Sequence, residues 1–149
     1  MDQPAVRVPW FSWVPLAAVS TFAALSALWV ALTPVVDQTE LTGRTWVDFA
    51  QQDPEVASLY SMELVILGFL GAGFGLLGAT VSLIPYRGGE RWSWYALWLV
   101  PITTGAVAAR MLVDRYSAGY FYAALFAAAV VGLLIPMRDV VGVRRTLPR

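Results

Sequence analysis

The sequence predicts an all-α integral membrane protein, an antiparallel bundle of four transmembrane helices with both termini in the cytoplasm and a short interfacial helix in the first outer loop. Its composition is 58% hydrophobic over 149 residues, and its mean hydropathy is +0.64. Soluble domains contain about half apolar residues, so this chain is too apolar for that class. Four predominantly apolar stretches reach about 20 residues, the length a helix needs to cross a hydrocarbon core of about 30 Å.

The four predicted spans are residues 14–33, 64–84, 94–113 and 117–137. Proline marks the end of three of them: Pro34 follows the first, Pro85 the second, and Pro136 lies at the end of the fourth. The connections between the second and third spans, and between the third and fourth, are short, so these helices should be antiparallel neighbours in sequence order. We expect a single membrane domain that covers residues 1–149.

The first span has an alternative interpretation as a cleaved signal peptide. Its flank carries only Arg7 against Asp2, and its uncharged stretch covers residues 8–36. The apolar part of a signal peptide is usually about 7–15 residues long, which this stretch exceeds. We therefore expect an uncleaved helix.

The basic residues, all of them arginine, predict the orientation. Placing both termini in the cytoplasm leaves Arg44, Arg110 and Arg115 outside or at the outer boundary. The same placement puts the other seven inside, namely Arg7, Arg87, Arg91, Arg138, Arg144, Arg145 and Arg149. This asymmetry follows the positive-inside rule. Residues 36–60 then form the outer loop, and residues 138–149 form a cytoplasmic tail.

The outer loop carries two helix-start signals. Thr45 and Asp48 are spaced as a capping box in which aspartate replaces the usual Glu or Gln, and apolar residues follow, so a short interfacial helix is expected here. Asp53, Pro54 and Glu55 are each favoured at the beginning of a helix. The second helix should therefore begin before the membrane, because 31 residues from Pro54 correspond to about 46 Å.

Small residues repeat at spacings of three and four in the second span. They are Gly68, Gly71, Gly75, Gly78 and Ser82. The first span repeats the same spacing with Ala17, Ser20, Ala24, Ala27 and Ala31. Such faces allow two backbones to approach closely, which is how helices associate in lipid. We predict that the two spans form an antiparallel pair through these faces, and that Ala124, Ala128 and Gly132 provide a further small face.

Glu63 and Arg110 are charged residues near the outer ends of the second and third spans. Counted from the inner boundary they lie at about 31 and 27 Å, so an ion pair between the two helices is sterically plausible. Asp114, one helical turn after Arg110, is a competing partner. One hypothesis places these three residues and Tyr60 in an outward-facing polar pocket. The alternative is that they extend to the interface and hold two helices together.

A kink is expected in the third span. Pro101, Thr103, Thr104 and Gly105 lie near its middle. Proline removes a helical hydrogen bond, and threonine hydroxyls can donate to the backbone carbonyl that is freed.

The residue types limit the chemistry. The chain has no cysteine and no histidine, which excludes thiolate and histidine catalysis, structural zinc and bis-histidine haem. The carboxylates, hydroxyls and arginines form no pattern that indicates a catalytic centre. We therefore expect no enzyme activity, no cofactor, no bound metal and no nucleic-acid partner.

Known four-helix families are matched in general layout only. The small multidrug-resistance exporters resemble this chain in helix number, but their key glutamate lies in the first helix, and residues 14–33 contain no acid. Claudin-like proteins need a paired-cysteine loop, and sterol-isomerase-like proteins need intramembrane acids that have no counterpart here. The chain resembles small bacterial four-helix membrane proteins, a resemblance that assigns no role to any residue.

The expected function is that of a cell-membrane protein without catalysis, an accessory, assembly or structural subunit that acts through helix packing. Its partners would be the lipid bilayer and a second copy or another membrane protein. The alternative is a small carrier or binding protein for a lipophilic or cationic molecule, which would use the outer carboxylates and Arg110.

Overall fold

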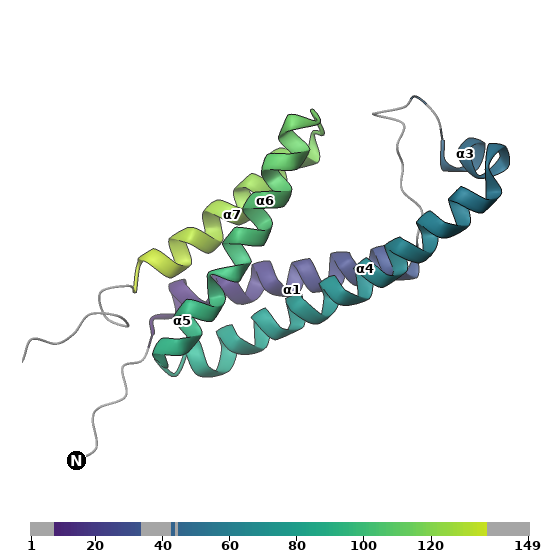
Figure 1. Cartoon of the computed structure of the whole chain (residues 1–149). Helices are drawn as coiled ribbons and strands as arrows, with labels where there is room; N and C mark the ends of the chain where they lie inside the picture. The colour runs from purple at the N-terminus through teal and green to yellow at the C-terminus, as the bar shows by residue number, and fades with distance from the viewer. Residues whose placement is uncertain (1–7, 34–42, 44, 137–149) are drawn as a thin grey trace, which may run out of the picture. The chain divides into compact units, whose positions relative to one another are not determined.

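The computed structural model describes residues 8–33, 43 and 45–136, and within this part the chain is all-helical and has no strand (Figure 1). The elements in chain order are α1 (Trp10–Leu32), α3 (Trp46–Gln52), α4 (Pro54–Val81), the π-helix η1 (Ser82–Tyr86), α5 (Arg91–Leu97), α6 (Leu99–Val113) and α7 (Ala118–Leu134). Several residues used to predict the spans and the orientation lie outside the described residues: Asp2, Arg7, Pro34, Arg44 and the predicted tail, residues 138–149.

Among the described residues, three helical stretches are long and apolar enough to cross a membrane. They are Trp10–Leu32 with 23 residues, Pro54–Tyr86 with 33 and Arg91–Val113 with 23. The apolar helix α7 has 17 residues, about 26 Å of helix, and is shorter than the predicted span of residues 117–137. It ends at Leu134 because Pro136 has no N–H with which to continue the helical hydrogen bonds.

The chain divides into two compact units. Unit 1 consists of residues 1–20 and 77–149, and unit 2 consists of residues 21–76. Each unit therefore contains one part of α1 and one part of α4. The single membrane domain expected for residues 1–149 stays a prediction.

In unit 2 the two predicted helix starts are confirmed. The Thr45 hydroxyl oxygen accepts a hydrogen bond from the Asp48 amide at 3.2 Å, and an Asp48 carboxylate oxygen accepts one from the Thr45 amide at 3.2 Å. This reciprocal capping box begins α3. Asp53 then accepts a hydrogen bond from the Val56 amide at 3.3 Å, and α4 begins at Pro54. Aspartate thus satisfies an amide that the first helical turn leaves without a partner.

Aromatic side chains connect α3 to α4. The ring centroid of Trp46 lies 5.6 Å from that of Phe49 and 5.9 Å from that of Tyr60. Tilted ring contacts at these distances are favourable. They hold the short helix α3 against the beginning of α4.

In unit 1 the helix that was expected to stop before Pro85 continues through it. The expected end at Ile84 is wrong, because η1 extends to Tyr86 as a π-helix. In a π-helix each amide bonds five residues back, and here the Arg87 amide donates to the Ser82 carbonyl at 3.3 Å. Such a wide turn accommodates the missing N–H of proline without ending the helix.

The third predicted span is broken into two helices. It begins at Arg91, three residues before the expected start at Trp94, and α5 ends at Leu97. A turn at Trp98 separates α5 from α6. Pro101 has no N–H to donate to the carbonyl of Leu97, four residues earlier, so the interruption lies before the proline and not at it.

Threonine hydroxyls donate to backbone carbonyls in α6, but not to the carbonyl that Pro101 frees, which the sequence had led us to expect. The Thr103 hydroxyl donates to Leu99 and the Thr104 hydroxyl donates to Val100, both at 2.8 Å. These carbonyls differ from that of Leu97, which Pro101 leaves without its helical donor. The hydroxyls therefore supplement the bonds after the break and do not replace the lost one.

α6 and α7 are antiparallel neighbours joined by the short turn that the sequence predicted (Figure 1). Arg115 in this turn has a positive φ of 63°, a conformation uncommon for residues other than glycine. Two glycines allow close contact in this pair. A Cβ built on Gly105 would lie 2.9 Å from the ring of Phe126, and one on Gly119 would lie 2.9 Å from Leu112.

Candidate functional site

The glycine face of α4 contacts the alanine face of α1 in unit 2. A Cβ built on Gly68 would lie 2.7 Å from the carbonyl oxygen of Ala27 and 2.7 Å from both the Cβ and the amide nitrogen of Ala31. One on Gly71 would lie 3.0 Å from the Cβ of Ala27. Optimal carbon–carbon contacts are about 3.5–4.0 Å, so the two backbones approach as closely as the absence of a side chain allows. The higher-numbered glycine contacts the lower-numbered alanine, as an antiparallel pair requires.

The same two helices also meet within unit 1. A Cβ built on Gly78 would lie 2.8 Å from the hydroxyl oxygen of Ser20, whose exposed fraction is 2%. The Ser82 side chain is fully buried, and its hydroxyl donates to the Gly78 carbonyl at 2.8 Å. Gly75 and Ala24, in unit 2, are buried as well.

Gly73 of α4 differs from Gly68, Gly71 and Gly78 in its surroundings. It belongs to α4 but not to the predicted small-residue face, it is exposed, and a Cβ built on it would meet nothing within 4 Å. Gly68, Gly71 and Gly78 thus lie against α1, and Gly73 does not.

Two buried side chains donate hydrogen bonds to the carboxyl end of α7. The Tyr86 hydroxyl donates to the Gly132 carbonyl at 3.0 Å, and the Trp94 indole N–H donates to the Leu133 carbonyl at 2.9 Å. The ordinary donor for Gly132 would be the amide of the residue four positions later, but that residue is Pro136. Tyr86 thus supplies the bond that the proline removes. Sequence reasoning did not identify these contacts, although the spacing of Gly132 and Pro136 indicates the missing donor.

A second group of contacts lies on the turn between η1 and α5. The Arg87 guanidinium carbon lies 5.2 Å from the centre of the Trp13 ring, within the range of a cation–π interaction. Glu90 accepts a hydrogen bond from the Trp92 indole N–H. The turn is thus fixed to α1 and to the start of α5.

The four polar residues predicted from the sequence are divided between the units. Arg110 Nε lies 2.8 Å from an Asp114 carboxylate oxygen, and the Arg110 side chain is 78% exposed. Asp114 was the competing partner in the sequence, and the structure pairs it with Arg110. Glu63 is exposed and Tyr60 is half-buried against Trp46, both in unit 2. An ion pair between Glu63 and Arg110 stays a prediction.

The described residues contain no group of three or more His, Cys, Asp or Glu side chains that could hold a metal ion. Comparisons with protein-family models, with curated proteins and with solved structures find no match to this chain. The inferences about function therefore depend on the helix contacts described above.

Proposed function

We propose that this chain is an integral membrane protein without catalytic activity, which acts through helix packing as an accessory, assembly or structural subunit. Its three long apolar helices and the shorter α7 would cross the cell membrane, with both termini in the cytoplasm. The orientation follows from the seven arginines that the sequence places on the cytoplasmic side, of which Arg87 and Arg91 lie on the turn between η1 and α5.

The observation that carries the proposal is the contact of Gly68 with Ala27 and Ala31. Lipid tails are as apolar as leucine, so helices in a bilayer associate through close packing and not through hydrophobic collapse. The glycine face of α4 lets the backbone of α1 approach closely, which is the kind of packing by which helices associate in lipid. It requires no substrate, cofactor or reactive side chain.

The outward faces of the helices fit a lipid or protein surrounding. Many large apolar side chains are about half or more exposed, among them Trp29, Leu67, Phe69, Leu70, Phe74, Leu76, Ile84 and Ile102. Water-soluble monomers rarely expose large contiguous apolar patches. On a membrane subunit such side chains contact lipid or the helices of a partner.

Native mass spectrometry of the protein, released from lipid nanodiscs after mild purification, tests the proposal. We expect a defined homo-oligomer or a stoichiometric complex with another membrane protein. A monomer without any protein partner under several extraction conditions would overturn it.

A further inference from the structure

The amino-terminal part of α4 extends beyond the length of a membrane span. Residues 54–86 form one helical stretch of 33 residues, about 50 Å long, whereas a hydrocarbon core is about 30 Å thick. In the proposed orientation Arg87 and Arg91 mark the inner boundary. The excess of about 20 Å then falls at the Pro54 end. We name residues 54–63 the outer extension.

One side of the outer extension is already covered. Ala57 is 5% exposed, and Tyr60 packs against Trp46 of α3. The other side carries large apolar side chains that nothing covers within the described part of the chain. Val56, Leu59 and Met62 follow one another at intervals of three residues and are 46%, 69% and 63% exposed, so they share one helix face.

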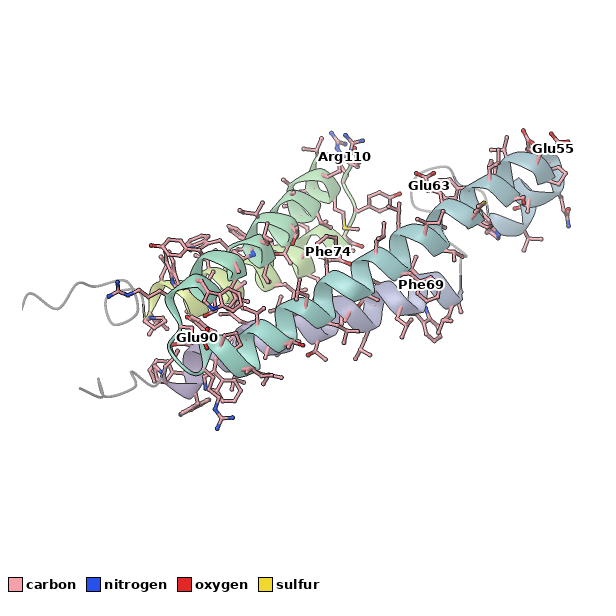
Figure 2. All side chains as sticks on the ribbon, turned by 60° about the horizontal axis from the view of Figure 1, so that its bottom comes forward. Glu55, Glu63, Phe69, Phe74, Glu90 and Arg110 are labelled. Carbon is pink, nitrogen blue, oxygen red and sulfur yellow. The ribbon has the colours of Figure 1, made fainter. Side chains whose placement is uncertain are left out.

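Two carboxylates lie on the same face. Glu55 and Glu63 are exposed and are interleaved with the apolar residues on the helical wheel. Both project from the same side of α4 in Figure 2. The face is therefore both apolar and acidic, and it lies outside the hydrocarbon core, where lipid tails do not reach it.

We propose that this face of the outer extension binds a basic amphipathic helix of a partner membrane protein, a helix in which Lys or Arg flank apolar residues. The inference rests on the proposed function and names the surface and the kind of partner. The apolar side chains at three-residue spacing match the anchors of helix-in-groove recognition. Charge complementarity selects the partner, because two copies of this acidic face would place like charges together.

Photocrosslinking in native membranes tests this assignment. A benzoylphenylalanine at Leu59 should crosslink to a protein segment that mass spectrometry identifies as apolar residues flanked by Lys or Arg. The same probe at Phe74, an exposed position in the middle of α4, should crosslink mainly to lipid.

Charge variants make the test specific. Glu55→Lys combined with Glu63→Lys should lower the Leu59 crosslink about tenfold, since two rim attractions become repulsions. The neutral pair Glu55→Gln and Glu63→Gln should give an intermediate loss. Glu90→Lys reverses a charge on the turn between η1 and α5 in unit 1 and should leave the Leu59 crosslink unchanged. Circular dichroism should show the same helix content in all these variants.

Several results would overturn the inference. They are a Leu59 crosslink to lipid, to a second isotopically labelled copy, to a segment without basic residues or to nothing, or a crosslink that charge reversal leaves unchanged. If native mass spectrometry still shows an assembly, this inference fails and the proposed function stands. If no assembly is found at all, both fail.

Discussion

A methyl group added at Gly68 should force α1 and α4 apart. In Gly68→Ala the new Cβ would lie 2.7 Å from the Ala27 carbonyl oxygen and from two atoms of Ala31. Two of these three atoms belong to the α1 backbone, so no side-chain rotation relieves the clash. The helices must separate locally by roughly 1 Å to restore an ordinary contact distance.

The expected loss of unfolding free energy in Gly68→Ala follows from a comparison with Gly73→Ala on the same helix. Both variants gain the higher helix propensity of alanine, about 1 kcal/mol relative to glycine. Gly73→Ala meets nothing within 4 Å and should be neutral or slightly stabilising. Overpacking costs about 1–3 kcal/mol, so Gly68→Ala should be less stable than Gly73→Ala by about that amount. Gly71→Ala, whose Cβ would lie 3.0 Å from Ala27 Cβ, should fall between them.

Equilibrium unfolding in mixed micelles, followed by tryptophan fluorescence during an SDS titration, measures these free energies. The helix content of each variant at low SDS serves as the folding control. Equal unfolding free energies for Gly68→Ala and Gly73→Ala would refute the inference that the two backbones are in close contact.

Three further predictions concern single hydrogen bonds and charges. Tyr86→Phe removes the donor to a buried carbonyl at the end of α7 and should lower the unfolding free energy by about 1–3 kcal/mol; Tyr95→Phe, at an exposed position, should leave it unchanged, and an equal loss in both would contradict the assigned bond. Thr45→Ala removes the capping box and should destabilise α3 by about 1 kcal/mol. Hydrogen exchange should then accelerate in the first turn of α3 and not in α6, and unchanged exchange would argue against the cap. Arg110→Gln breaks a largely exposed ion pair and should change the unfolding free energy by less than about 0.5 kcal/mol, so a loss of several kcal/mol would indicate a buried partner.

The features that the sequence predicted well are those with local causes. The Thr45 capping box and the helix start at Pro54 depend on residues three or four positions apart, and the structure has both. The lengths of the three long apolar helices follow from composition in the same way.

The features that the sequence did not predict depend on contacts between distant segments or on departures from α-helical geometry. Pro85 was expected to end a helix, but a π-turn passes through it, and the sequence contains no clear signal for that turn. The bond from Tyr86 to Gly132 joins residues 46 positions apart. A kink was expected near Pro101, and the structure has a break at Trp98 instead, because a proline affects the turn that precedes it.

The polar residues also differ in whether their contacts are local or join distant segments. Arg110 and Asp114 are four residues apart, so their pairing follows from local helix geometry. Whether Glu63 also approaches Arg110 depends on the arrangement of units 1 and 2, which spacing along one helix does not determine. The exposed apolar residues of the outer extension were likewise not singled out, since their significance arises from the burial of Ala57 on the opposite side.

The most direct test of the central claim is a cryo-EM structure of the mildly purified protein in lipid nanodiscs, with its copurifying proteins and lipids retained. We predict that Gly68 contacts Ala27 and Ala31 in the bilayer, and that a second protein chain packs against an exposed helix face. A lone chain covered by lipid on every face, or ligand density in a hydrated cavity near Arg110, would contradict a role through helix packing.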